Sequence, residues 1–246
     1  MILKKWEDLP EALRTDAVRP YYEALQKKQF ALICKRLFDI VVSAIMLLIL
    51  LPVFLILAIA IKIDSPGPVF YRQVRVTQYG KQFRIFKFRS MVANADKIGT
   101  QVTVGNDSRI TRMGKLIRKC RLDELCQLID ILRGTMTFVG TRPEVPKYVA
   151  GYTPEMMATL LLPAGVTSLA SILYKDEDLL LDGAEDVDKV YIQEVLPEKM
   201  RHNLQAVKNF SFLKDIKTMF MTVFAVLGKE YTSEAGSTNK EKVEIQ

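Results

Sequence analysis

The sequence predicts a mainly helical α+β protein that is attached to a membrane. Three observations support this class. Residues 40–61 form an uncharged apolar stretch, two short segments at 69–76 and 82–88 lie on either side of a glycine-containing turn, and from residue 108 onward the pattern is mainly helical. An apolar run of about 20 residues is the length that a helix needs to match a hydrocarbon core, and two short strands joined by a turn predict a hairpin.

The amino-acid composition limits the binding partners and the catalytic mechanisms that the protein can have. The 246 residues carry a formal net charge of +7, which indicates an anionic partner: nucleic acid, an anionic lipid surface or a phosphate-bearing substrate. Cys34, Cys120 and Cys126 include no Cys-x-x-Cys pair, so neither a zinc site nor a disulfide framework is predicted. His202 is the single histidine. Mechanisms that need two histidines are therefore excluded, and carboxylates, lysines and arginines must carry most of the chemistry.

The apolar stretch leaves two topologies open. It is not a signal peptide, because 39 residues precede it and no small-residue cleavage site follows. Pro52 lies near its middle, where proline removes a backbone hydrogen bond and bends a helix. Basic residues occupy both flanks, namely Lys27, Lys28, Lys35 and Arg36 before it and Lys62, Arg72, Arg75, Lys81 and Arg84 after it. Basic flanks are typical of the cytoplasmic side. A re-entrant helix would keep both flanks there, whereas a plain spanning helix with a tolerated proline would not.

The remaining elements follow in order. Residues 9–33 read as one or two short helices, and Asp64-Ser65-Pro66-Gly67-Pro68 is a strong breaker before the hairpin. Helices are predicted at 111–119 and at 123–132, the second ended by Gly134. In that second helix the residues Leu122, Leu125, Leu128, Ile129 and Leu132 would form one face, with Asp123, Gln127 and Asp130 on the other.

Near the C-terminus, an apolar stripe at residues 212–227 has helical spacing, with Ser211 as N-cap and Gly228 beyond the end. A core helix is the favoured interpretation of this stripe, and a helix in the membrane interface is the alternative. The polar tail at 232–246 is predicted to be disordered.

Asp123 and Glu124 are the candidate reactive carboxylates. A lone Asp-Glu pair at a helix start usually serves capping and the helix dipole. Here Arg118 and Arg142 add permanently charged, planar donors that suit phosphate oxygens, and neighbouring carboxylates can hold a magnesium ion bound to a diphosphate.

Five blocks of the sequence carry a resemblance to a known family. They are residues 64–73, 86–91, 106–114, 122–128 and 134–144. In this order they resemble the signature blocks of the bacterial sugar transferases, which are monotopic phosphoglycosyl transferases or polyprenyl-phosphate hexose-1-phosphate transferases. The resemblance extends from about residue 35 to 228, and its length makes it far more specific than one short motif.

The resemblance implies a fold and a set of site residues. The family has a re-entrant membrane helix broken near a proline, which matches Pro52, and amphipathic interfacial helices. Its adjacent acids match Asp123, the nucleophile, and Glu124, with Mg²⁺ (Mn²⁺ as an alternative) held at the pair. The implied phosphate-binding residues are Arg118, Arg142, Lys87 and Arg89. The implied organisation is an N-terminal extension at 1–34, a membrane helix at 35–64, a catalytic domain at 65–231 and the tail at 232–246.

The implied activity is transfer of a sugar-1-phosphate from a UDP-sugar to polyprenyl (undecaprenyl) phosphate, with release of UMP and a phosphosugar-aspartate intermediate. The implied location is the cytoplasmic face of a bacterial inner membrane, with membrane lipids but no nucleic acid as partners and a homodimer left open. The rival interpretation is a non-catalytic membrane adaptor that binds anionic lipid or nucleic acid. This chain has Cys126 and Thr141 where the family usually has proline and Thr77 where glycine is common, and its segment 162–171 matches only loosely. The sugar is therefore not predicted.

Overall fold

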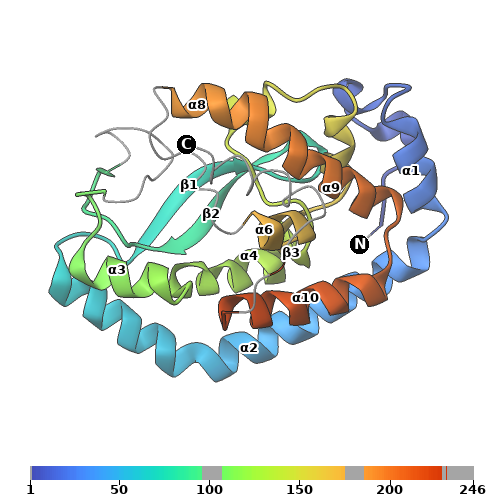
Figure 1. Ribbon diagram of the computed structural model, residues 1–246. Helices are drawn as coiled ribbons and strands as arrows, with labels where there is room; N and C mark the ends of the chain where they lie inside the picture. Colours follow the sequence, from blue (N-terminus) through green and yellow to red (C-terminus); the bar gives the residue numbers. More distant parts are fainter. Residues whose placement is uncertain (1, 96–106, 175–185, 229–230, 232–246) are drawn as a thin grey trace.

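The computed structural model describes residues 2–95, 107–174, 186–228 and 231. The longest helix, α2 (Gln29–Asp64), runs along one side of the molecule with α10 (Phe212–Val226) beside it, and the β1–β2 hairpin and helices α3 and α4 lie on the inner side of α2 (Figure 1). The predicted mainly helical α+β class is confirmed.

The N-terminal segment is part of the core. It forms two short 3-10 turns, η1 (Trp6–Asp8) and η2 (Glu11–Leu13), followed by α1 (Arg19–Gln26). Leu13, Tyr22 and Leu25 are buried in a cluster that also contains Leu161 from η6 (Met156–Leu161) and Val207 from α9 (Leu196–Lys208). The segment therefore packs against elements that lie more than a hundred residues further along the chain.

Helix α2 extends beyond the predicted apolar stretch at both ends. It has 36 residues, a length of about 54 Å at 1.5 Å per residue, and is long and apolar enough to cross a membrane. One face packs on the domain through Phe38, Leu57 and Ile61. The opposite face leaves large apolar side chains exposed: Leu37, Val41, Ile45, Leu48, Ile49, Leu51, Leu55, Ile56, Ile59 and Ile63.

The break that the resemblance implies at Pro52 takes the form of a bend. α2 stays helical through Pro52, and Figure 1 shows it changing direction along its course. Proline removes one hydrogen bond and crowds the preceding turn, which bends a helix without having to end it.

The predicted hairpin is confirmed. β1 (Phe70–Val76) pairs antiparallel with β2 (Gln82–Phe88), with Phe70 opposite Phe88 and Val76 opposite Gln82. A second, parallel pair was not predicted: β3 (Met136–Val139) lies beside β4 (Ala164–Thr167). Strands of four residues are too short to show a period of two in the sequence.

Helix α3 (Arg112–Lys119) begins as predicted, because the Thr111 hydroxyl accepts a hydrogen bond from the Gly114 amide at 3.0 Å. The second predicted helix instead has two parts, the 3-10 helix η5 (Leu122–Gln127) and the α-helix α4 (Leu128–Arg133), which ends at Gly134. The single polar face predicted for Asp123, Gln127 and Asp130 is therefore wrong. A 3-10 helix has three residues per turn, so the spacing of an α-helix does not carry through it.

Gln127 and Asp130 are in fact buried, and Asp130 Oδ2 accepts a hydrogen bond from the Phe86 amide at 2.8 Å. This bond joins α4 to strand β2. The carboxylate is therefore a link between two elements rather than part of a solvated face.

The favoured prediction for the C-terminal stripe is also wrong. α10 has the predicted bounds, but none of its residues is buried, and Leu213 is 78% and Phe220 64% exposed. A core helix would hide its apolar side chains, so the burial pattern matches the interfacial alternative. Ser211 precedes the helix without a capping hydrogen bond from its side chain. The predicted disordered tail at 232–246 lies outside the described residues.

Candidate active site

The two candidate carboxylates lie in the short 3-10 helix η5, directly after an unusual backbone position. Arg121 has φ 54° and ψ 24°, the left-handed conformation, and it separates α3 from η5. For a residue other than glycine this conformation costs about 1 kcal/mol or more. Such strain persists only where the surrounding structure enforces it, and here it fixes the direction in which Asp123 and Glu124 leave α3.

Glu124 is held by two cations. Both terminal nitrogens of the Arg142 guanidinium bind the Glu124 carboxylate, and Nη1 lies 3.2 Å from Oε2. Lys87 Nζ lies 3.7 Å from Oε1 of the same carboxylate. A two-pronged guanidinium–carboxylate contact fixes geometry as well as charge. Burial by itself would raise the pKa of Glu124, but the positive charges of Arg142 and Lys87 outweigh it and lower that pKa below the ordinary value. Glu124 is therefore ionised.

Asp123 is in the opposite situation. Within the described part of the chain its carboxylate makes no hydrogen bond or ion pair with another side chain. Burial raises the pKa of Asp123, the charge of Lys87 opposes this, and the charge of Glu124 adds to it, so that the pKa lies above its usual range. Two adjacent carboxylates whose pKa values are driven apart are typical of groups with different chemical roles.

The position of Arg142 is fixed by the β3–β4 pair. Beyond the paired strands, the Gly140 amide donates to Thr167 O at 3.0 Å and the Gly165 amide donates to Thr141 O at 2.8 Å. The two chains approach so closely that a side chain at Gly165 would collide with the Gly140 backbone. Arg142 Nη1 also lies 3.3 Å from Val166 O, so its guanidinium is tied to β4 as well as to Glu124.

The structure brings together five of the six predicted site residues. Lys87, on β2, has the largest favourable charge effect on Asp123, and Arg118, in the last turn of α3, also acts on it. Among the described residues the Arg118 guanidinium makes no hydrogen bond or ion pair, so it has no carboxylate of its own there.

The sixth residue, Arg89, is placed elsewhere. Its guanidinium donates to the carbonyl oxygens of Pro66 at 2.8 Å and Ser65 at 2.6 Å, at the end of α2. Gly67 has φ 125° and lies against this guanidinium, where a side chain would collide with it. Arg89 is buried and anchors the end of α2 to the end of β2, so the structure gives it no place beside Asp123.

Two departures from the family pattern have structural uses. The Thr77 hydroxyl donates to Thr135 O at 2.6 Å and accepts from the Ala164 amide at 3.1 Å, which ties the end of β1 to β3 and β4. Cys126 is fully buried, with its sulfur 3.4 Å from Asp123 O. The sequence offered no signal for these contacts, nor for the pairing of Glu124 with Arg142.

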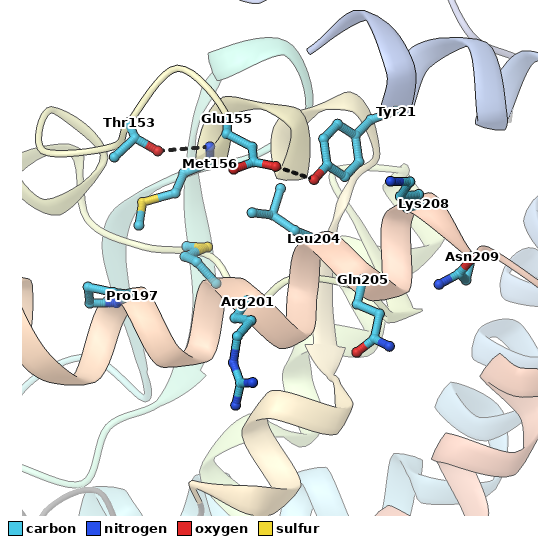
Figure 2. Close-up of a pocket in the computed structure, with 11 residues that line it drawn as sticks. Tyr21, Thr153, Glu155, Met156, Pro197, Arg201, Leu204, Gln205, Lys208 and Asn209 are labelled. Carbon is cyan, nitrogen blue, oxygen red and sulfur yellow. Dashed lines mark hydrogen bonds between the residues drawn. The ribbon is translucent and has the colours of Figure 1, made fainter. Parts of the chain in front are cut away.

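A surface groove of about 530 Å³ lies between α1, η6 and α9. Figure 2 shows Tyr21 donating to Glu155 at one side and Leu204 projecting toward the space between them and α9. The groove shares no lining residue with the group around Asp123. It lacks that site's juxtaposed carboxylates, so the candidate active site is the Asp123 group and not this groove.

Comparison with known proteins fits this geometry. A family model described as bacterial sugar transferase matches residues 30–229, which include every residue of the candidate site. The chain belongs to this family. The match extends from the start of α2 to the end of α10, so the long apolar helix and the exposed C-terminal helix are both parts of the shared domain.

Curated relatives differ in the sugar that their names give. A UDP-N-acetylgalactosamine-undecaprenyl-phosphate N-acetylgalactosaminephosphotransferase of Aeromonas hydrophila is 35% identical over 196 residues, covering 78% of this chain and 43% of the relative. A UDP-glucose:undecaprenyl-phosphate glucose-1-phosphate transferase of Escherichia coli (strain K12) is 36% identical over 195 residues, covering 77% and 39%. The exopolysaccharide production protein PSS of Rhizobium leguminosarum bv. phaseoli is 37% identical over 207 residues, covering 80% and 96%. The chain thus spans about two fifths of the first two relatives and nearly all of the third.

The site can be compared with what magnesium requires. Among the described residues no third Asp, Glu, His or Cys joins Asp123 and Glu124 to form a protein metal cluster. Magnesium is usually held by one or two carboxylates together with substrate phosphates and water. An unpaired carboxylate at Asp123 next to the ionised Glu124 fits that mode of binding and does not fit an all-protein cage.

Proposed function

We propose that this bacterial sugar transferase moves a sugar-1-phosphate from a UDP-sugar to a polyprenyl phosphate and releases UMP. The relatives' names give UDP-sugars and undecaprenyl phosphate as substrates, and they support the same substrate classes here. We infer that the reaction has two steps, with Asp123 as the nucleophile. Because one substrate is soluble and the other is in the lipid, a covalent intermediate spares the site from holding both anions at once.

The observation that supports this mechanism is the difference between the surroundings of the two neighbouring carboxylates, Asp123 and Glu124. Glu124 is paired with Arg142 and Lys87, whereas the Asp123 carboxylate has no hydrogen-bonding partner among the described residues and lies in the field of Lys87 and Arg118. A carboxylate that is already paired is a poor nucleophile. Asp123 is the one that can approach a phosphorus atom, and the cations reduce its repulsion from the phosphate oxygens.

In each of the two steps, one bond to the sugar-bearing phosphorus forms and another breaks. A carboxylate oxygen of Asp123 forms a bond to the sugar-bearing phosphorus, and the bond from that phosphorus to the bridging oxygen breaks, so that UMP leaves with the electron pair. A phosphate oxygen of the polyprenyl phosphate then attacks the same phosphorus. The bond to Asp123 breaks, which restores the carboxylate and gives a polyprenyl diphosphate sugar.

In this proposal the cations around Asp123 and Glu124 neutralise the negative charge of the substrate phosphates. Lys87 and Arg118, whose charges act on Asp123, would bind phosphate oxygens, and Arg142 keeps Glu124 ionised and oriented. Mg²⁺ would be held by Asp123 and Glu124 with substrate oxygens, where it would neutralise diphosphate charge. Arg89 is not part of this proposal, because its Nη1 and Nη2 donate to backbone carbonyls at the end of α2.

Re-entry of α2 is the membrane topology that its anchoring supports. At its N-terminal end, Lys35 Nζ donates to Asp215 Oδ2 at 2.6 Å and to Val139 O at 2.9 Å. At its other end, Asp64 accepts from the Met113 amide at 3.0 Å, and Arg89 holds the carbonyls that follow. Both ends are thus tied to one folded domain, which must lie on one side of the bilayer. We infer that this side is cytoplasmic, since the UDP-sugar is there.

The topology predicts how two exposed positions behave. Phe30 is 80% and Ile63 81% exposed, and they lie at opposite ends of α2. In a background without Cys34, Cys120 and Cys126, Phe30→Cys and Ile63→Cys should both resist a membrane-impermeant thiol reagent in intact cells. Both should react once the cells are permeabilised, which is the control for reactivity. Labelling of only one position from outside would establish a spanning helix.

The proposed function is tested by supplying purified protein with polyprenyl phosphate and, in turn, a panel of UDP-sugars, and measuring UMP. One or a few sugars should give UMP together with a lipid-linked product when Mg²⁺ is present, and excess chelator should abolish both. A membrane adaptor would release no UMP with any sugar. The same panel identifies the sugar.

A further inference from the structure

A buried network of charged and hydroxyl groups lies behind Arg142. The Glu144 carboxylate accepts a hydrogen bond from the Tyr191 hydroxyl at 2.6 Å, and it lies 3.9 Å from Nη1 of Arg75 and 3.9 Å from Nζ of Lys199. Lys199 Nζ also donates to the Tyr191 hydroxyl at 3.1 Å. Glu144, Tyr191 and Lys199 are buried. None of these three residues, nor Arg75, has a role in the proposed transfer mechanism.

Burying charges in this way is costly, and replacing a buried ion pair with apolar residues is often neutral or stabilising. Stability alone therefore does not account for the network. One general use of a buried polar group is to fix a single arrangement of the elements that it joins. The elements joined here are β1, the segment after β3, and the helical run α8 (Val187–Val190), η7 (Tyr191–Val195) and α9.

The segment fixed by the network carries the cation of the active site. Arg142, Pro143 and Glu144 are consecutive, and Arg75 donates to Pro143 O at 3.0 Å while the Val76 amide donates to Glu144 O at 2.9 Å. Strand β1 therefore holds the backbone from one side, and Tyr191 and Lys199 hold the Glu144 side chain from the other. Pro143 has a fixed φ, which removes one of the rotations by which the backbone between Glu144 and Arg142 could absorb a shift.

Tyr191 begins a local irregularity in the helical run. α8, η7 and α9 form one continuous run across the top of the view in Figure 1, and residues Tyr191–Val195 in its interior make a π-helical turn. Such turns insert a residue into an α-helix and occur often at functional sites. Here the turn lies where the helical run meets Glu144.

We propose that Glu144 and Tyr191 are positioning residues for the transfer reaction, which act by holding Arg142 against Glu124. This inference rests on the proposed function. The Tyr191 hydroxyl is hydrogen-bonded to Glu144, and without it, among the described residues, the Glu144 side chain is held on the helical run only by the 3.9 Å ion pair with Lys199. The segment that carries Arg142 is then held less firmly, although no group that touches the substrate has been altered.

The structure offers a matched control for Tyr191. The rings of Tyr148 and Tyr191 pack against each other with centroids 4.7 Å apart, and each hydroxyl donates to one carboxylate. Tyr148 donates to Asp188 at 2.5 Å, whereas Tyr191 donates to Glu144. Tyr148→Phe and Tyr191→Phe therefore remove the same atom and keep the same ring packing, but only the second removes a hydrogen bond to Glu144.

We expect Tyr191→Phe to lower kcat/KM for the UDP-sugar about 10-fold, because a displacement of one ångström at a reacting centre can cost up to about 100-fold. Tyr148→Phe should leave kcat/KM close to wild type. In an Arg142→Lys background, Tyr191→Phe should cause no further loss, since the group that it positions has gone. Glu144→Gln, which keeps an acceptor for Tyr191 but removes the negative charge, should behave like Tyr191→Phe.

Equal losses in the two phenylalanine variants would overturn the inference, and so would a Tyr191→Phe loss that persists in full in the Arg142→Lys background. Melting temperatures of all variants separate a general loss of stability from this coupling. If the wild-type protein transfers no sugar phosphate at all, the proposed function has failed. If it does so but the two tyrosines are equivalent, the positioning role has failed.

Discussion

Asp123→Asn should reduce transfer by on the order of 10⁴-fold to 10⁶-fold, the range seen when an enzyme loses its nucleophile. The amide is nearly the same size as the carboxylate but cannot form the acyl phosphate. Asn also removes a negative charge beside the ionised Glu124, so the variant should fold at least as stably as the wild type. Steady-state UMP release and thermal unfolding, measured on the same preparation, check both expectations.

The pH dependence should report the same residue. The nucleophile must be ionised, and burial raises the pKa of Asp123. Activity should therefore fall, as the pH is lowered, at a higher pH than an ordinary aspartate would dictate. As a control, Asp16→Asn makes the same chemical change at an exposed aspartate and should alter neither rate nor profile. Comparable activity in Asp123→Asn and Asp16→Asn would exclude a nucleophilic Asp123.

Arg142→Lys should lower kcat/KM by about 10²-fold to 10³-fold, the typical effect of removing one donor that stabilises a transition state. Lysine keeps the charge but cannot reproduce the two-pronged contact with Glu124 or the bond to Val166 O. The misplaced charge would leave Glu124 incompletely paired. Initial rates over a range of UDP-sugar concentrations measure the loss.

The matched control for this variant is Arg201→Lys. Arg201 pairs with Glu198 on the exposed side of α9, and the same substitution there should leave kcat/KM close to wild type. The effect of Arg142→Lys should also be smaller in a Glu124→Gln background, because the Arg142–Glu124 pair has then lost its negative charge. An Arg142→Lys enzyme with wild-type kcat/KM would show that the two-pronged contact between Arg142 and Glu124 is not needed for the reaction.

Local patterns in the sequence predicted the elements that they determine. Two short segments at 69–76 and 82–88 around a glycine-containing turn predicted the hairpin, the helical pattern at 111–119 predicted α3, and the uncharged run at 40–61 predicted α2. The acidic pair, Arg118 and Arg142 were candidates from their residue types, and a resemblance that spans most of the chain supplied their roles and added Lys87 and Arg89. Of those cations, the structure places Lys87, Arg118 and Arg142 around the acids.

What the sequence missed depends on contacts between distant segments. Lys87 lies on β2 and Arg89 directly follows that strand, yet Arg89 anchors the end of α2 and Lys87 faces Glu124, because different parts of the chain pack around the two positions. A left-handed Arg121 and the 3-10 geometry of η5 changed which side chains share a face. For α10, apolar spacing alone could not distinguish a core from a bilayer, since both bury the same stripe.

The basic flanks of α2 illustrate the same point. Lys35 is buried on Asp215, Arg36 donates to Ile131 O at 2.6 Å, and Arg75 lies against Pro143, so these charges hold the fold together. As evidence for membrane topology they are weaker than their number in the sequence indicated. The anchoring of both ends of α2 to one domain is the stronger argument for re-entry.

The covalent role of Asp123 is tested most directly by withholding the lipid. Wild-type protein mixed with its UDP-sugar and Mg²⁺, but no polyprenyl phosphate, should release a burst of UMP close to one per active site. It should also carry the sugar phosphate as a mass adduct on the peptide that contains Asp123. Asp123→Asn should give neither signal. Full turnover with lipid present, but no burst and no adduct when it is absent, would contradict the two-step mechanism and indicate direct attack by the lipid phosphate.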